Sequence, residues 1–300
     1  MIIPTYRAGD DLQKLLDSLG RQELQPVETI VIDSGSPADT LKMAESCGSR
    51  VVSIKPGAFD HGGTRNLAAG KAKGSILVFM TQDALPVDDQ LLKKLVDPLR
   101  DKKNIVSYAR QLADDNAPLS EKYLRLTNYP PRSARKTAEQ IETDGIRTFQ
   151  CSNVCAAYRS KEFKNLGCFP TPVVCNEDML FAAKAIFAGY AVVYNAEAVV
   201  WHTHHYNCPD LFRRYFDIAA SLDHNRHIRS VGKVEASGKI FLMNQLRYIR
   251  EQRKYYQLIK VFPEALAKYL GFKTGENHTC LPRKLKKYLG LNRGYWSKME

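Results

Sequence analysis

The sequence predicts an α/β fold in which a Rossmann-like mixed, mainly parallel sheet is flanked by helices and followed by a helical, basic C-terminal extension. Two observations carry this prediction. Over residues 1–80, short apolar runs alternate with segments of helical periodicity, which is typical of a parallel sheet covered on both faces. After Pro209 the pattern is almost entirely helical, and this region holds the net positive charge.

The N-terminal strands are short runs rich in β-branched residues, and a helix follows each of the first three. Strands are expected at residues 1–5, 27–32, 51–54 and 75–80. Helices are expected around residues 12–19, 38–47 and 68–73. Beyond residue 106 mixed strands and long loops follow. They include a helix at 177–187, which Gly189 ends, and a strand at 191–201.

Composition excludes several classes of protein. Of the 300 residues, 44% are hydrophobic and 25% charged, which is typical of a globular protein rather than a disordered or disulfide-stapled chain. No apolar run reaches the roughly 18 residues that a membrane span needs, and no apolar signal segment follows a basic start. Seven cysteines without a CxxC pair predict free thiols in a reducing cytosol.

Charge divides the chain into two regions. Residues 213–300 hold 19 Lys or Arg and 7 Asp or Glu, which accounts for the formal net charge of +12, whereas residues 1–212 hold 25 of each sign. We therefore expect one domain over 1–212 and a second, basic region over 213–300. The basic region is expected to contact an anionic membrane surface or nucleic acid, unless it is a solvated helical face.

Polar side chains follow the ends of five expected strands. Ligands of open parallel sheets bind at the carboxyl ends of the strands, so these side chains are expected to share a site. Neither GxGxxG after the first strand nor GxxxxGK(S/T) is present, which argues against a dinucleotide oxidoreductase and a P-loop enzyme. The strand-end residues are Tyr6, Asp33, Asp60, His61, Asp83 and His202.

Eight short segments resemble one enzyme family. Four of them, in this order, are similar to inverting glycosyltransferases of family two, which have the A-type nucleotide-sugar fold: 2–6 (IIPTY), 31–36 (VIDSGS), 81–84 (TQDA) and 176–178 (NED). Four more resemble the rhamnosyltransferase branch: 59–66 (FDHGGTRN), 151–154 (CSNV), 202–206 (HTHHY) and 214–217 (RYFD). With the tail around 268–272 and Trp296, the resemblance covers nearly the whole chain.

This resemblance implies a metal-dependent inverting glycosyltransferase of the branch that builds rhamnose-containing cell-surface polysaccharides. Its donor would be dTDP-β-L-rhamnose, bound by the domain over 1–212, and its acceptor a glycan or a lipid-linked sugar. Two alternatives are open. One is a family-two enzyme with a different donor, because the motifs of a fold do not determine the sugar. The other is a nucleic-acid-binding protein that uses the basic tail, although no nucleic-acid recognition motif is visible.

Asp83 is the first candidate metal ligand, because it follows a buried strand and hard divalent cations take carboxylate oxygens. Its structural alternative is a turn or helix-capping aspartate. The sequence has one acid here where the family has two, so a second protein ligand is needed. The resemblance assigns His202, with His204 as the alternative, and imidazole favours Mn²⁺ over Mg²⁺. His205 is expected to be a structural histidine.

Asp178 is the candidate general base by resemblance. It lies in the first turn of the expected helix, where Asn176 is the expected cap and the helix dipole would keep the carboxylate ionised. An ionised carboxylate can accept the proton of an attacking sugar hydroxyl. Acidic residues are common in first turns for the dipole alone, so only the resemblance favours catalysis. Glu177 is not expected to share the role.

Five residues are candidates for binding the donor. Arg65 and Asn66 follow a Gly-Gly pair and are expected to open a helix, so that backbone amides and the guanidinium hold the diphosphate. His61 would approach the donor sugar. Asp33 would hold the pyrimidine or its ribose, and Tyr6 would pack on the base. An exposed arginine in a turn is the alternative for Arg65.

The basic region contains a leucine stripe beside lysines. Basic amphipathic helices suit an anionic membrane surface, which predicts a cytoplasmic enzyme, peripheral on the inner face of the cell membrane and close to a lipid-linked acceptor. Packing of the leucines against the catalytic domain, or against another copy of the chain, is the alternative. The stripe consists of Leu281, Leu285 and Leu289, with Lys284, Lys286 and Lys287 beside it.

Overall fold

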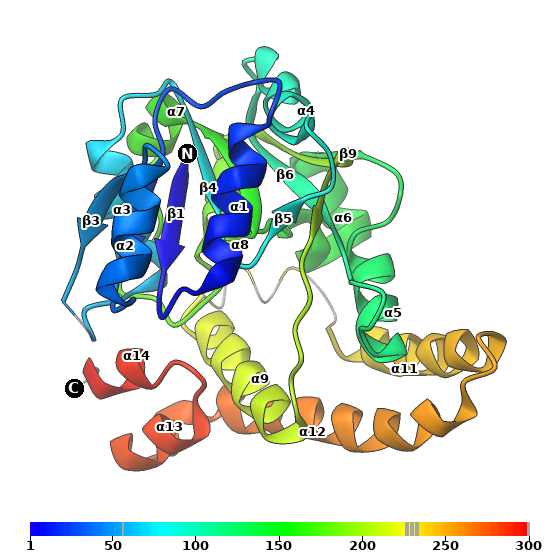
Figure 1. The fold of residues 1–300 in the computed structure, drawn as a ribbon. Helices are drawn as coiled ribbons and strands as arrows, with labels where there is room; N and C mark the ends of the chain where they lie inside the picture. Colours follow the sequence, from blue (N-terminus) through cyan, green and yellow to red (C-terminus); the bar gives the residue numbers. More distant parts are fainter. Residues whose placement is uncertain (56, 226–227, 229–230, 232–233, 299–300) are drawn as a thin grey trace.

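The computed structural model describes residues 1–55, 57–225, 228, 231 and 234–298. Over this part of the chain, one sheet is covered by helices on both faces, and a further layer of helices lies against one edge (Figure 1). The strands are β1 (Ile2–Thr5), β2 (Ile30–Asp33), β3 (Arg50–Ser53), β4 (Ile76–Met80), β5 (Leu85–Pro86), β6 (Asn104–Leu112), β7 (Ala134–Lys136), β8 (Cys155–Arg159) and β9 (Ala191–Trp201).

The helices cover the sheet and form the C-terminal region. Those before residue 200 are α1 (Asp10–Gly20), α2 (Ala38–Ser46), α3 (His61–Lys71), α4 (Leu91–Val96), α5 (Leu119–Asn128), α6 (Ile141–Asp144), α7 (Ser160–Asn165) and α8 (Glu177–Phe187). Those after it are α9 (Cys208–Asp223), α11 (Val234–Glu251), α12 (Leu258–Glu276), α13 (Arg283–Leu289) and α14 (Arg293–Lys298).

The sheet is mixed and mainly parallel, as predicted. Its strands lie in the order β3-β2-β1-β4-β8-β6-β9-β5, with β7 paired to β9. The pairing makes β1, β2, β3, β4, β6 and β9 point the same way, while β5, β7 and β8 run against them. The carboxyl ends of β1, β2, β4 and β9 therefore lie along one edge of the sheet.

Alternate residues of the central strands point into two separate cores. Ile2, Ile30 and Ile32 pack in a core with side chains of α3 and α8. Ile3 and Val31 pack in a second core with side chains of α1 and α4. Because both faces are buried, these strands have almost no polar residues until their carboxyl ends.

Two element boundaries differ from the prediction by three residues or more. β2 starts at Ile30 rather than residue 27, because Val27 is 87% exposed and the ladder with β1 begins only at Ile30. α3 starts at His61, well before the predicted start, because Asp60 caps it: Oδ1 of Asp60 accepts the Gly63 N–H at 2.6 Å. The structure confirms α8 and β9 with the predicted ends.

The C-terminal region is helical, and α9 connects it to the sheet. α9 and α12 approach closely at two glycines of α12. A Cβ on Gly271 would lie 2.2 Å from the carbonyl oxygen of Phe212, and a Cβ on Gly275 would lie 2.3 Å from that of Phe216. The predicted domain boundary at residue 212 falls inside α9. Among the described residues, no helix has the combination of length and apolar character that crossing a membrane requires.

The end of the chain folds back onto α9. The indole Nε1–H of Trp296 donates to Oδ1 of Asp217 at 2.7 Å, and the ring is buried against Phe216. Leu281 and Leu289 pack against this same cluster. Two leucines of the predicted membrane stripe therefore stabilise the fold, and Leu281 precedes α13 rather than belonging to it. This corrects the predicted helical stripe.

Candidate active site

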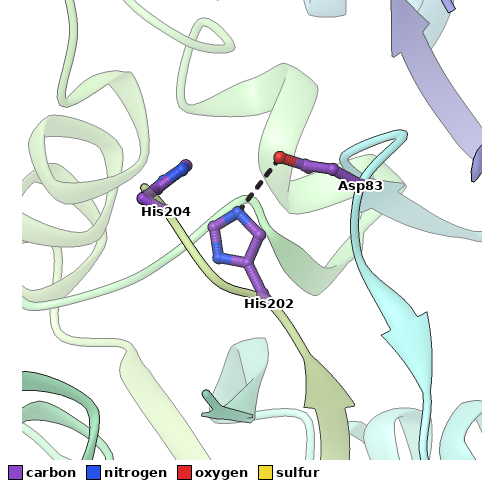
Figure 2. Close-up of side chains that lie close together, drawn as sticks. All are labelled: Asp83, His202 and His204. Atoms are coloured by element: carbon purple, nitrogen blue, oxygen red, sulfur yellow. Dashed lines mark ion pairs between the residues drawn. The ribbon is translucent and has the colours of Figure 1, made fainter. Parts of the chain in front are cut away.

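Asp83, His202 and His204 come together beyond the carboxyl ends of two strands. Asp83 lies in the loop after β4 and the histidines follow β9, and their possible ligand atoms all lie within 4.8 Å of one another (Figure 2). Nε2 of His202 lies 3.4 Å from Oδ2 of Asp83, and the centroids of the two imidazole rings are 4.4 Å apart. Since β9 ends at Trp201, it is the segment after the strand that brings the two histidines together.

This set of side chains fits a divalent cation. Burial would raise the pKa of Asp83, but the hydrogen bond with His202 outweighs it and holds the pKa well below its usual range. Burial, with the neighbouring His202 and Arg214, lowers the pKa of His204 to about 2. An ionised carboxylate and a neutral imidazole are the protonation states that bind metal ions. Asp83, His202 and His204 are therefore the residues that would hold a cation.

Gln111 of β6 orients the buried His202 ring. The side-chain amide of Gln111 donates to the Tyr129 hydroxyl and to Oγ of Ser152, both at 2.8 Å, and its Oε1 accepts from Arg125. Oε1 also lies 2.9 Å from Nδ1 of His202. Because an amide oxygen can only accept, Nδ1 must carry the proton. Nε2, the ring nitrogen that faces Asp83, is then the one left to bind a metal ion.

Asn153 holds the two acids at the start of α8. Its backbone N–H donates to Oδ2 of Asp178 at 2.8 Å, and its side-chain amide donates to Oε1 of Glu177 at 3.0 Å. Oδ1 of Asp178 accepts from the backbone N–H of Met179 at 2.8 Å. Because Ser152 bonds to Gln111 and Asn153 bonds to Asp178, one dipeptide links the metal-ligand cluster to the candidate base.

The pKa of Asp178 is raised to about 7, by burial first and by the charge of Glu177 second, although hydrogen bonds from Asn153 and Met179 oppose the shift. The expectation that the helix dipole keeps this carboxylate ionised is therefore wrong, since burial and a neighbouring charge outweigh the dipole. Asn176 does occupy the N-cap position, but its side chain makes no capping bond. A carboxylate with a pKa near neutrality is well suited to accept a proton.

Glu177 is ionised and paired with Arg65. Burial would raise the pKa of Glu177, but the positive charge of Arg65 outweighs it and lowers the pKa. The two charged groups are 3.2 Å apart and both are buried. Arg65 also donates to the backbone carbonyl of His61 at 2.9 Å, while its Nε has no hydrogen-bond partner within the described part of the chain. Glu177 forms this ion pair, whereas both carboxylate oxygens of Asp178 accept from backbone N–H groups. That Glu177 does not share the role of base stays a prediction.

The Gly62–Gly63 pair does not form the open turn that was predicted before the helix. Both glycines lie inside the first turn of α3, and a Cβ on Gly62 would lie 2.0 Å from the carbonyl oxygen of Pro170. Close contact with another loop of the protein thus requires glycine at position 62. The contact of Arg65 with a diphosphate stays a prediction, and so does the approach of His61 to the donor sugar.

Asn66 is bonded to the same neighbouring loop. Its side-chain amide donates to the carbonyl oxygen of Phe169 at 2.9 Å and accepts the Phe169 backbone N–H at 3.1 Å. This reciprocal pair fastens α3 to the loop before α8 and engages both ends of the amide. The predicted contact of Asn66 with the donor stays a prediction.

Asp33 and Tyr6 lie at the ends of β2 and β1. Burial would raise the pKa of Asp33, but hydrogen bonds from Ser36, Gly35 and Thr5 outweigh it and hold the pKa below its usual range. Tyr6 is 53% exposed at the rim of the site. A side-chain amide, that of Gln82, pairs with both backbone groups of Tyr6 at 2.9 and 3.2 Å and thereby ties the loop after β1 to the loop carrying Asp83.

A cavity of about 250 Å³ lies beside the two metal-site histidines. Gln111, Ser152 and Arg214 line it from the body of the protein, and Glu264 and Lys268 of α12 line it from the C-terminal region. His205 also borders it, with a side chain that is 65% exposed, so the expectation of a structural histidine there is wrong. The cavity lies between the two predicted regions.

Sequence reasoning missed Gln111 and gave Asn153 no role. A glutamine inside the apolar run of β6 is a signal that could have identified Gln111, because a buried amide needs partners. Asn153 stood in a segment that resembles the family, but its double contact with Glu177 and Asp178 depends on a loop that packs against α8.

Residues 1–167 match the family model described as glycosyl transferase family 2. The chain belongs to this family. The match includes β1 to β8, the loop carrying Asp83 and the Asn153 loop, whereas α8 and β9 lie beyond it. The family-two assignment that the sequence motifs predicted is thereby confirmed, and the protein is a glycosyltransferase.

Two relatives of this glycosyltransferase are similar over its full length. It is 35% identical over 303 residues to the O-antigen chain rhamnosyltransferase RfbN of Salmonella typhimurium, an alignment that covers 100% of this chain and 96% of the relative. It is 33% identical to the O-antigen chain rhamnosyltransferase WbaN of Salmonella anatum, with the same coverage. The similarity thus includes the basic C-terminal region.

Solved structures confirm the fold. The mannosyltransferase PcManGT from Pyrobaculum calidifontis, in complex with GDP-Man and Mn²⁺, superposes with a TM-score of 0.57 at 18% identity, over 99% of this chain and 84% of that chain. Residues 1–349 of S. aureus TarS, in complex with UDP-GlcNAc, give a TM-score of 0.55 at 17% identity, over 93% of this chain and 90% of that chain. The family-two glycosyltransferase therefore has the predicted A-type fold.

Proposed function

We propose that this glycosyltransferase transfers L-rhamnose from dTDP-β-L-rhamnose to a hydroxyl group of a growing glycan or a lipid-linked acceptor. The observation that carries the proposal is the full-length similarity to two O-antigen chain rhamnosyltransferases. The fold leaves the donor open, because its structural neighbours bind GDP-Man and UDP-GlcNAc. A family-two enzyme with a different donor is therefore the second candidate.

Asp178 would act as the general base in a single displacement. The acceptor oxygen forms a bond to the anomeric carbon while the bond from that carbon to the diphosphate breaks, and the hydroxyl proton moves to the Asp178 carboxylate. dTDP leaves, and inversion of the β-linked donor gives an α-linked rhamnoside. The backbone N–H groups of Asn153 and Met179 hold the carboxylate in one orientation, and its raised pKa supports the proposed role.

Asp83, His202 and His204 would hold Mn²⁺ or Mg²⁺. When bound, such a cation supplies positive charge that stabilises the departing diphosphate. The hydrogen bond between Gln111 and His202 keeps the histidine in its metal-binding form. Two imidazoles in a set of three favour Mn²⁺ over Mg²⁺.

The nucleotide would lie along the carboxyl ends of β1 and β2. Tyr6 is exposed there and can pack on the base, while Asp33 shapes the turn that faces the ribose or the pyrimidine. Arg65 would add positive charge near the diphosphate if its unpartnered Nε donates to it. We place the enzyme in the cytoplasm at the inner face of the membrane, and the basic C-terminal region supports that placement.

A thermal-shift panel tests the donor and the metal together. The protein is heated with dTDP, UDP, GDP or ADP, each in Mn²⁺ and in chelator. The proposal expects the largest stabilisation with dTDP and its loss in chelator. A preference for UDP or GDP would keep the family and overturn the donor. The absence of a shift with every nucleotide would contradict nucleotide-sugar binding itself.

A further inference from the structure

One face of α12 carries large apolar side chains that point into solvent. They recur every three or four residues, so they form a single stripe along the helix. The exposed fractions are 77% for Ile259, 61% for Phe262, 57% for Leu266, 59% for Tyr269 and 45% for Leu270. Helices that pack against a protein core turn such residues inward, so this stripe needs a separate explanation.

The opposite face of α12 already supplies the packing contacts. Gly271 and Gly275 press against the backbone of α9, and Val261 is buried in a small core with Ile249 and Leu119. These residues lie on the side of the helix away from Ile259 and Leu266. In Figure 1, α12 runs along the border of the molecule farthest from the sheet. The apolar stripe therefore lies on the side of α12 opposite these packing contacts and is exposed to solvent.

An apolar groove continues the stripe toward α13. It has a volume of about 450 Å³ and lies between α9, α12 and α13. Leu266 and Leu270 belong to both the stripe and the groove, and Tyr288, which is 65% exposed, forms part of the far wall. Stripe and groove together make one continuous apolar surface on the C-terminal region.

The same region is strongly cationic. Residues 253–298 contain eleven Lys or Arg and two Asp or Glu. Lys260 is an exposed residue of α12, and Lys284 and Lys287 are exposed on α13, beside the groove. A surface that joins exposed apolar side chains to a basic rim matches the boundary between headgroups and acyl chains of an anionic bilayer.

We propose that the α12 stripe and its groove dock the enzyme onto an anionic lipid bilayer. A second copy of the chain fits less well, because the two cationic surfaces would repel each other. Nucleic acid would pair with the basic residues but would leave the row from Ile259 to Leu270 in water. Only the bilayer accommodates both properties. The surface differs from the one expected from the sequence, since Leu281 and Leu289 are used for packing.

The position of α12 links membrane docking to the candidate active site, and this link rests on the proposed function. Glu264 and Lys268, on the packing side of the helix, line the cavity beside His202 and His204. One helix, about 10 Å across, therefore separates the apolar surface from the candidate active site. A bilayer on α12 would keep a lipid-linked sugar within reach of that cavity.

Vesicle flotation of the full chain tests the proposal. Vesicles of phosphatidylcholine mixed with phosphatidylglycerol are compared with vesicles of phosphatidylcholine alone. We expect the wild type to float with the anionic vesicles. The triple variant Ile259→Ser, Phe262→Ser, Leu266→Ser should bind them at least roughly tenfold more weakly. The matched control, Leu24→Ser, Val27→Ser, Leu126→Ser, removes three exposed apolar side chains elsewhere and should float like the wild type.

Several results would overturn the docking surface. One is equal flotation of the stripe variant and the wild type. Another is a dimer in light scattering that the stripe variant abolishes, without vesicle binding. Binding to a polynucleotide but not to vesicles is a third. The dTDP thermal shift is measured on every variant. A stripe variant that keeps the dTDP shift but no longer floats supports docking. If dTDP produces no thermal shift in the wild type, that result counts against the proposed function and not against the docking surface.

Discussion

Nδ1 of the buried His202 lies 2.9 Å from the amide oxygen of Gln111. The amide nitrogen of Gln111 is committed to Tyr129 and Ser152, so the oxygen must face the ring. This one contact determines which nitrogen of His202 is free to bind a metal. It also connects β6 to the segment after β9 at the point where the candidate metal site lies.

Replacing Gln111 should therefore weaken metal binding, although Gln111 is not itself a candidate metal ligand. We expect Gln111→Leu to lower Mn²⁺ affinity by about 10–100-fold, because the ring loses its orientation and its fixed tautomer. Electron paramagnetic resonance of free Mn²⁺ measures this directly. Gln22→Leu is the matched control, since Gln22 is also buried and hydrogen-bonded but lies elsewhere. Equal losses in both variants would indicate a general loss of structure instead.

Asp83→Ala should abolish the metal-dependent part of nucleotide binding. The variant removes the one carboxylate of the cluster and leaves two imidazoles, a poor set for a hard cation. Titration calorimetry with dTDP should then give the same affinity in Mn²⁺ and in chelator. If Mn²⁺ still strengthens dTDP binding in the variant, Asp83 is not a ligand.

Asp178→Asn should retain dTDP binding and lose transfer. General-base catalysis contributes about 10²–10⁴-fold, and an amide cannot accept the proton. Product formation is followed by mass spectrometry. Asp210→Asn is the control, because Asp210 is also an acid in the first turn of a helix but belongs to α9. Turnover of Asp178→Asn at the wild-type rate would remove Asp178 from the mechanism.

Activity should fall as the pH drops through the pKa of Asp178, which burial and Glu177 raise to about 7. Below that pH the carboxyl is protonated and cannot accept a proton. This raised pKa changes stability with pH in the direction opposite to that of a carboxylate whose pKa is lowered by an ion pair. Because the folded-state pKa is above the unfolded value of 3.8, ionisation of Asp178 costs stability as pH rises from about 4 toward 7.

Two measurements check this pH dependence. The pH profile of kcat should show an acidic limb with an apparent pKa that falls in Glu177→Gln, since the neighbouring negative charge is removed. Thermal unfolding at pH 8 should give a higher Tm for Asp178→Asn than for the wild type. A flat profile from pH 5 to pH 8 would contradict both the pKa and the role.

Trp296→Ala should destabilise the protein by roughly 3–5 kcal/mol, because the ring is fully buried against Phe216 and its N–H bonds to Asp217. Urea unfolding measures the change. Trp201→Ala is a control within the same chain, since Trp201 is 38% exposed and should cost about 1 kcal/mol or less. Similar costs for both would show that the tail is not docked on α9 in solution.

The sequence alone determined the alternation of strands and helices over residues 1–80, the ends of α8 and β9, the family and the three metal-site candidates. Hydrophobic periodicity and the polarity of residues at strand ends are local properties, so short stretches of sequence are enough to reveal them. Only the tertiary structure decided which polar groups face one another. It paired Arg65 with Glu177, placed Gln111 behind His202 and raised the pKa of Asp178 through burial.

The two faces of α12 illustrate the same division. The sequence shows that residues 258–276 are rich in apolar side chains and can form a helix, but it does not show which side meets α9. The two glycines at 271 and 275 decide this, because the absence of a Cβ lets the backbones of α9 and α12 approach on that side. The row from Ile259 to Leu270 is left in solvent for that reason. Close packing depends on shape in three dimensions, and no pattern along the chain records it.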